Sequence, residues 1–187
     1  WAVPWGGRGV LRGARGRGGA EEPRCLEVAE RVGKNLRAAG FRVLMTRNAD
    51  VVVPLGTRVR IANSQKDAEF ICIHFNSATR SGANGIETYY YRSDSARLAA
   101  SIHRQVVGGT TTDNRGIRRR GFYVLRKTNI PSILVECGFL TNPTEAQLAL
   151  RTDYRDRLHQ PTPYATLAHP TRCNRQAVPD PHHGTHP

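Results

Sequence analysis

The segment 132–135, with the sequence Ser-Ile-Leu-Val, is short, apolar and rich in β-branched residues, which predicts a buried β-strand. Glu136 follows this segment directly, and Cys137 and Gly138 come next. A carboxylate at the end of a buried strand is costly unless it has a charged partner, a metal ion or a chemical task. The fold must therefore enclose a β-sheet, and Glu136 is the first candidate for a functional residue.

Segments of this kind alternate along the chain with segments of helical periodicity. Strands are predicted over 41–47, 69–75, 86–91, 122–125 and 132–137, and helices over 26–36, 55–63, 98–106 and 142–150. Asn142, Pro143 and Glu145 form a typical helix start, with the asparagine as N-cap. The alternation predicts an α/β fold, a single domain with a twisted, mostly parallel sheet flanked by helices.

Both ends of the chain lack this pattern. Residues 1–20 are rich in Gly and Arg without periodicity, which indicates an irregular arm. Residues 159–187 are rich in Pro and His, so we expect a disordered tail there and one folded domain over 21–158. The chain begins with Trp1 rather than Met, and we interpret it as a fragment or a processed product.

The formal net charge of +13 favours polyanionic partners, either nucleic acid or an anionic cell wall. A solvated basic surface explains the arginines equally well. No nucleic-acid-binding motif accompanies the charge, so we expect no nucleic-acid partner. No run approaches about 18 apolar residues, so we expect no membrane span. The four cysteines form no C-x-x-C pair, and Cys72 and Cys137 are interpreted as small buried hydrophobic residues.

Three ionisable side chains stand at the ends of predicted elements. His74 ends the strand 69–75, Glu136 ends the strand 132–137, and Glu21 opens the first helix. In open α/β sheets, sites form beyond the carboxyl ends of the strands. His74 and Glu21 could then bind zinc, with Glu136 as a general base. Two simpler interpretations stay open, in which His74 is a hydrogen-bonded polar residue and Glu21 favours a helix N-terminus.

Two motifs resemble those of a known family. They are I-H-F-N-S-A at 73–78 and V-E-C-G-F-L-T-N-P-T-E at 135–145. With the segments around them, these motifs resemble the zinc-dependent N-acetylmuramoyl-L-alanine amidases, which cleave peptidoglycan. The resemblance is continuous from about Glu21 to Leu158. It implies that the domain over 21–158 is catalytic.

The resemblance implies a role for each candidate residue. The family holds zinc with a His in a D-P-G-H-G-G motif, with a Glu that opens the first helix and with the His of I-H-x-N-S. By this resemblance Glu21 (with Glu22 as the weaker alternative) and His74 are zinc ligands. Glu136 is the catalytic residue, and Asn76 lines the same cleft and contacts substrate. Three further residues match positions common in the family and are interpreted as structural: Arg47, Arg58 and Asn63.

One zinc ligand of the family has no counterpart in the sequence. No His precedes residue 74, and Val-Pro-Trp-Gly-Gly stands at 3–7 where D-P-G-H-G-G is expected. The resemblance also implies that the first strand of the sheet and the last helix are missing. Our hypothesis is that both ends are frameshifted. Sequencing of the encoding DNA would contradict it if no alternative frame yields a segment like D-P-G-H-G-G.

The implied function is hydrolysis of the amide bond between N-acetylmuramic acid and L-alanine in peptidoglycan, impaired by the loss of one zinc ligand. The alternative is a catalytically inactive module that binds peptidoglycan. The resemblance also implies zinc as the cofactor. It further implies a secreted monomer located in the periplasm or the extracellular cell wall.

Overall fold

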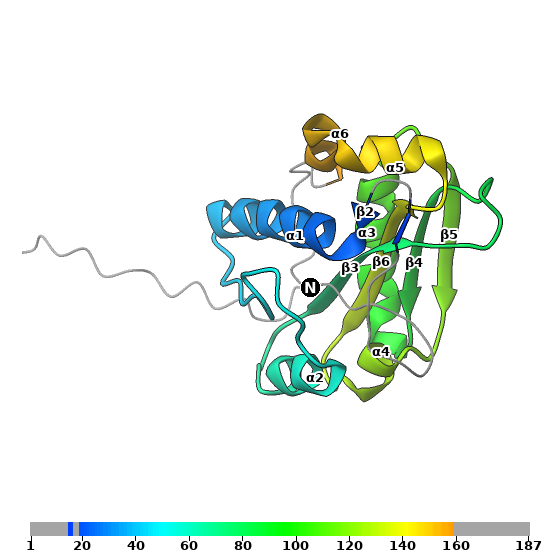
Figure 1. The fold of residues 1–187 in the computed structure, drawn as a ribbon. Coiled ribbons are helices and arrows are strands. Elements are labelled where there is room, and N and C mark those ends of the chain that lie inside the picture. Colours follow the sequence, from blue (N-terminus) through cyan, green and yellow to red (C-terminus); the bar gives the residue numbers. More distant parts are fainter. Residues whose placement is uncertain (1–14, 17–18, 159–187) are drawn as a thin grey trace, which may run out of the picture.

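A four-stranded sheet forms the centre of the computed structural model, which describes residues 15–16 and 19–158 (Figure 1). In spatial order its strands are β3 (Phe70–Asn76), β6 (Ser132–Phe139), β4 (Ile86–Tyr90) and β5 (Asn114–Arg119). The β3–β6 and β4–β5 pairings are parallel, whereas β4 and β6 are antiparallel. The predicted α/β fold is confirmed, with a sheet that is mixed and contains more parallel than antiparallel pairings.

A short antiparallel pair precedes the first helix. It consists of β1 (Arg15–Gly16) and β2 (Gly19–Ala20), which fall within the predicted irregular arm. The rest of that arm and the predicted tail over 159–187 lie outside the described residues. The same holds for the segments where the missing first strand and last helix of the family would stand.

Helices cover both faces of the sheet (Figure 1). On one face, the core includes residues of α1 (Glu21–Ala38), α3 (Ala96–Gly108), α5 (Pro143–Leu150) and α6 (Thr152–Arg157). On the other face, it includes residues of α2 (Leu55–Asn63) and α4 (Tyr123–Lys127). A short 3-10 helix, η1 (Ser93–Ser95), leads into α3. The predicted flanking helices are thus confirmed.

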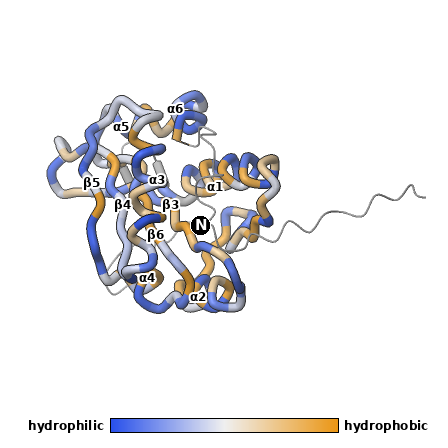
Figure 2. The backbone as a smooth tube through the Cα atoms, turned by 180° about the vertical axis from the view of Figure 1, so that it is seen from behind, coloured by the Kyte–Doolittle hydropathy of each residue, from blue (hydrophilic) through white to orange (hydrophobic). Residues whose placement is uncertain are grey.

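Alternate residues of the central strands enter the two cores. Ile73 and Val135 pack in the core that includes α1 and α3, whereas Cys72 and Leu134 pack in the core that includes α2 and α4. Successive side chains of a strand point to opposite faces, so β3 and β6 are buried on both sides. This explains why their sequences are continuous apolar runs. By contrast, α1 contacts the sheet on one side, and Figure 2 shows it with alternating hydrophobic and hydrophilic bands.

The predicted start of α5 is confirmed in detail. The side-chain oxygen of Asn142 accepts hydrogen bonds from the backbone N–H groups of Thr144 (2.9 Å) and Glu145 (3.2 Å). Pro143 occupies the first turn, where its missing N–H costs nothing. This cap fixes the point at which the chain leaves β6 and enters α5.

Two predicted strands are wrong. Segment 41–47 is unpaired with any strand in the part of the chain that the structure describes, and a strand without a partner leaves its backbone groups unbonded. Residues 123–125 of the predicted strand 122–125 lie in α4 and Phe122 is its N-cap, so the N–H of Arg126 donates to the carbonyl of Phe122 (2.9 Å). A short apolar run cannot distinguish a buried strand from one helical turn, and the packing of α4 against α2 and β6 decides here.

Besides the short β1, β2 and η1, two elements of the domain were not predicted from the sequence. Strand β5 reads Asn-Arg-Gly-Ile-Arg-Arg, and Figure 2 shows it mostly in the hydrophilic colour. It is an edge strand of the described sheet, so it can carry charges where a central strand cannot. Helix α6 is short and carries charged residues at four of its positions, which hides its helical period. None of the described helices is both long and apolar enough to cross a membrane.

Candidate active site

Three ionisable side chains lie side by side across the sheet. His74 on β3 is the register partner of Glu136 on β6, and Glu136 is in turn the register partner of Glu87 on β4. His74 follows Cys72 by two residues, and Glu136 follows Leu134 by two, so both point to the α2–α4 face. Because β3 and β6 are parallel, His74 and Glu136 stand near the carboxyl ends of both strands. The predicted juxtaposition of these two residues is confirmed.

Glu21 completes this group from the first turn of α1. Its Oε1 lies 2.8 Å from Nδ1 of His74, and both side chains are buried. The backbone N–H of Phe75 donates to the same Oε1 (3.3 Å). The fold therefore brings Glu21 and His74 together although they are 53 residues apart in the sequence.

Glu136 is the residue of this group with an unpaired carboxylate oxygen. Its Oε2 is buried and has no hydrogen-bond partner among the described residues. Burial raises the pKa of Glu136 well above its ordinary value, and the nearby carboxylates of Glu21 and Glu87 raise it further. A raised pKa makes the carboxylate a stronger base than an ordinary glutamate, which suits a group that must take up a proton and return it.

The raised pKa of Glu136 predicts a pH-dependent stability difference between the wild type and a Glu136→Gln variant. In metal-free protein, folding favours the protonated carboxyl, so the wild type loses this stabilisation as pH rises from about 4.3 through the raised pKa. The neutral amide has no such loss. We expect the variant to gain stability over the wild type as pH increases from 4 to 8, measured by urea unfolding with a chelator present. A constant difference across this range would contradict the assignment.

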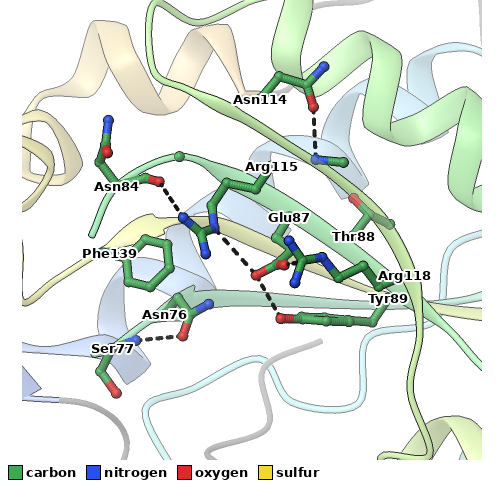
Figure 3. Close-up of polar contacts among 12 residues, drawn as sticks. Asn76, Ser77, Asn84, Glu87, Thr88, Tyr89, Asn114, Arg115, Arg118 and Phe139 are labelled. Atoms are coloured by element: carbon green, nitrogen blue, oxygen red, sulfur yellow. Dashed lines mark hydrogen bonds and ion pairs between the residues drawn. The ribbon is translucent and has the colours of Figure 1, made fainter. Parts of the chain in front are cut away.

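Glu87 was not identified from the sequence, and it contacts several polar side chains in the cluster shown in Figure 3. The hydroxyl of Tyr89 donates to its Oε2 (2.7 Å). Nε of Arg118 lies 2.8 Å from its Oε1, and Nε of Arg115 lies 3.6 Å from its Oε2. The charged partners come from β5, a strand that the sequence did not predict, so no local signal linked them to Glu87.

Asn76 is the last residue of β3 and stands two positions beyond His74. Its Oδ1 accepts a hydrogen bond from the N–H of Ser77 (2.8 Å), and its carbonyl accepts one from the N–H of Leu140 (2.9 Å). Figure 3 places its side chain near Phe139, on the same side of the cluster as Ser77. Its predicted contact with substrate stays a prediction.

Glu145 is a second buried carboxylate that sequence reasoning saw merely as part of a helix start. It accepts hydrogen bonds from the backbone N–H groups of Gly85 (2.9 Å) and Phe139 (2.6 Å), and from the hydroxyl of Thr112. Gly138, with φ of +124°, permits this close approach, because a Cβ there would lie 3.3 Å from the Glu145 carboxyl carbon. Glu145 thus ties the end of β6 to the segments that precede β4 and β5.

Replacement of Glu145 by Ala should destabilise the fold by about 3 kcal/mol or more, because it leaves at least two buried N–H donors unpaired. Urea unfolding at pH 7 measures this loss. Glu30→Ala is the matched control, since Glu30 is an exposed carboxylate on α1. The assignment fails if the two variants lose the same stability.

The other residues singled out from the sequence have structural contacts. Cys72 and Cys137 are free and buried. Burial raises the pKa of Cys72 to about 12 and also raises the pKa of Cys137, so neither thiol is activated. Arg58 donates to the carbonyl of Val53 (3.0 Å). The side chain of Asn63 links α2 to the end of α4 by bonding the carbonyl of Lys127 and the N–H of Asn129. Arg47 forms an ion pair with Asp50 (3.2 Å).

The donors around Glu21 and His74 fit zinc in their chemistry. An imidazole nitrogen and a carboxylate oxygen are both ligand types that Zn²⁺ accepts, and the unpartnered carboxylate of Glu136 lies close enough to feel the charge of Glu21. A catalytic zinc site usually has three protein ligands. Within the described ranges, no group of three His, Cys, Asp or Glu side chains is placed to hold a metal. These two residues would therefore supply part of such a site.

Comparison with protein families gives one match that covers most of the chain. The model of Amidase_3, described as N-acetylmuramoyl-L-alanine amidase, matches residues 6–162. Among curated proteins, the N-acetylmuramoyl-L-alanine amidase LytC of Bacillus subtilis is 35% identical over 152 residues, which cover 79% of this chain and 31% of LytC. "Probable cell wall amidase LytH" of Staphylococcus epidermidis is 34% identical over 140 residues, which cover 75% of this chain and 45% of LytH. The chain thus spans less than half the length of either relative.

Solved structures give similar matches that cover most of both chains. The catalytic domain of the N-acetylmuramoyl-L-alanine amidase CwlV from Bacillus (Paenibacillus) polymyxa var. colistinus is 35% identical, with a TM-score of 0.77 over 82% of this chain and 88% of that one. The N-acetylmuramoyl-L-alanine amidase AmiC2 of Nostoc punctiforme is 36% identical, with a TM-score of 0.76 over 80% of this chain and 84% of that one. The fold described above is therefore that of these two amidase structures.

Proposed function

Because the chain belongs to the Amidase_3 family of N-acetylmuramoyl-L-alanine amidases, we propose that it hydrolyses the amide bond between N-acetylmuramic acid and L-alanine in peptidoglycan. The observation that carries this proposal is the buried Oε2 of Glu136, which has no hydrogen-bond partner among the described residues. Glu136 lies on the strand next to His74, which contacts Glu21. A general base with a raised pKa beside two ligand-type side chains is suited to amide hydrolysis.

In this proposal Glu136 moves the proton. Its carboxylate takes a proton from the attacking water while a C–O bond forms at the lactyl carbonyl carbon. The protonated carboxyl then donates that proton to the nitrogen of L-alanine as the C–N bond breaks. The products are a carboxylic acid on the muramic acid and a free amine on L-alanine.

We further propose that Glu21 and His74 hold zinc, which when bound would supply a Lewis acid that polarises the carbonyl and lowers the pKa of water. The 2.8 Å contact of the two side chains supports their assignment to one metal. With two protein ligands from the described residues, we expect a lower zinc affinity than that of a site with three. The alternative of an inactive peptidoglycan-binding module has no observation in its favour.

The names of the relatives also suggest where the protein acts. LytH is named as a cell wall amidase, so we propose that this protein works on peptidoglycan in the extracellular or periplasmic cell wall. The net charge of +13 supports this assignment, because an anionic wall attracts a basic protein.

Incubation of the purified protein with peptidoglycan sacculi tests the proposed function. We expect soluble fragments to appear together with new amino groups on L-alanine, detected by N-terminal labelling. Release of reducing sugar ends without free L-alanine amines would indicate cleavage of glycan strands and overturn the proposal. Binding to sacculi without any release would instead favour the inactive module.

A further inference from the structure

Two arginines, Arg115 and Arg118, flank the candidate site, and the proposed reaction gives neither of them a role. Arg115 and Arg118 of β5 both reach Glu87, which is the register partner of Glu136 (Figure 3). Glu87 thus has two guanidinium partners, one more than the neutralisation of a single carboxylate requires. A buried carboxylate that needed only charge balance would be satisfied by one arginine.

A β-bulge brings both arginines to the same face. Ile86 of β4 pairs with Asn114, and Thr88 pairs with Ile117, so β5 has one extra residue in this interval. Residues three apart on a regular strand point to opposite faces, and the bulge removes that difference for Arg115 and Arg118. Gly116 permits the bulge, because its φ of +83° lies in the left-handed region.

Side chains of β5 itself, of β4 and of α3 hold the bulge in place. The Oδ1 of Asn114 accepts a hydrogen bond from the N–H of Gly116 (2.9 Å) and contacts Nε2 of His103 in α3 (2.8 Å). Nδ1 of the same imidazole contacts the hydroxyl of Thr88 (3.0 Å). This chain of contacts fixes the backbone from which the arginines extend, so their guanidinium groups are preorganised.

The two arginines differ in their capacity for a further ligand. Arg115 donates to the carbonyl of Asn84 (3.3 Å), and its guanidinium lies 5.0 Å from the ring centre of Phe139. Arg118 contacts Glu87 through Nε, and its terminal nitrogens have no hydrogen-bond partner among the described residues. The Arg118 side chain is 48% exposed, against 34% for Arg115. Arg118 therefore presents two free donors to solvent beside the site.

The position of Arg118 matches one group of the proposed substrate. Glu87 lies one strand spacing, about 4.8 Å, from Glu136, and β5 is one strand further. In the stem peptide, L-alanine is followed by a D-glutamate linked through its side chain, so its α-carboxyl is either a free carboxylate or an amidated, neutral carboxamide. This group is two residues, about 7 Å, from the scissile carbonyl in an extended chain.

We propose that Arg118 binds this α-carboxylate and makes the site selective for the unamidated stem peptide. The inference rests on the proposed function, because it takes the scissile bond to lie at Glu136. Planar guanidinium donors suit a carboxylate, and a carboxamide would place its own N–H donors against them. Arg115 and Glu87 then act as positioning residues that hold Arg118 in place.

Binding of two matched compounds tests the proposal without any turnover. Calorimetric titration of the 187-residue chain with Glu136→Gln would compare N-acetylmuramoyl-L-alanyl-D-glutamate with its D-isoglutamine counterpart, which differs by one carboxamide. We expect the carboxylate compound to bind about tenfold more tightly or better. Equal affinities, tighter binding of the carboxamide, or no binding of either compound would overturn the proposal.

A matched pair of arginine variants locates the selectivity. Added to Glu136→Gln, Arg118→Gln should reduce the carboxylate preference to less than about twofold. Arg119→Gln should keep it, because Arg119 bonds the carbonyl of Tyr91 and stacks on that ring rather than contacting Glu87. Equal losses in both variants would indicate a general charge effect and contradict the proposal.

The wild-type protein separates this proposal from the proposed function. If the wild-type protein releases no L-alanine amines from sacculi but the carboxylate is still preferred through Arg118 in the binding assay, the proposed function fails and the assigned selectivity stands. If both compounds are hydrolysed equally and bind equally, the function stands and the selectivity fails.

Discussion

We expect the Glu136→Gln variant to hydrolyse peptidoglycan roughly 10²- to 10⁴-fold more slowly than the wild type, since a carboxamide cannot accept the proton of water. Gln has nearly the same shape as Glu, so the packing of the site and the substrate position should be preserved. The loss should therefore appear in kcat, with KM little changed. Release of L-alanine amines from sacculi at pH 7 measures it.

Glu69→Gln is the matched control for this experiment. Glu69 is a half-buried carboxylate whose pKa is also raised by burial, but it precedes β3 at the end of the strand opposite to His74. We expect this variant to retain most of the wild-type rate. Similar losses in both variants would show that Glu136 affects hydrolysis through the fold rather than through proton transfer.

Replacement of His74 by Ala should lower zinc affinity by more than about 100-fold and remove hydrolysis with it. Loss of a residue that merely orients a ligand already costs about 10- to 100-fold, and we propose that His74 binds the metal directly. Zinc content after dialysis against a range of buffered zinc concentrations measures the affinity. Full zinc retention in this variant would exclude His74 as a ligand.

Two further variants keep this experiment interpretable. Glu21→Gln removes the partner of His74 while preserving its size, and it should also lose zinc if both residues bind one ion. His103→Gln removes another buried imidazole, which contacts Thr88 and Asn114 rather than Glu21, and it should keep zinc. Circular dichroism of each variant confirms that the protein assayed is folded.

Local sequence patterns were sufficient for the centre of the sheet and for one helix cap. The apolar runs of β3 and β6 identify both strands, because a strand buried on two faces has few polar positions. Asn142 and Pro143 identify the start of α5, since capping depends on neighbouring residues alone. His74 and Glu136 could be placed near each other for the same reason, as each ends one of these strands.

Local patterns did not predict the secondary structure of segments whose conformation depends on contacts with distant parts of the chain. Segment 41–47 has strand composition but no strand partner in the described part of the chain, and segment 122–125 is apolar enough for either a strand or a helical turn. Strand β5 carries three arginines, which an edge strand tolerates. These charged residues hide the alternation of apolar and polar positions by which a strand is predicted.

By itself, the sequence determined the α/β class, the strand ends that carry His74 and Glu136, and the family resemblance. Each of these depends on residues close together in the chain. The tertiary structure alone decided the environment of these residues. It placed Glu87 beside Glu136 and brought Arg118 into contact with Glu87 through the bulge at Gly116. It also linked the end of β6 to distant loops through Glu145. Such contacts join side chains that are far apart in sequence, so their geometry exists only once the sheet has formed.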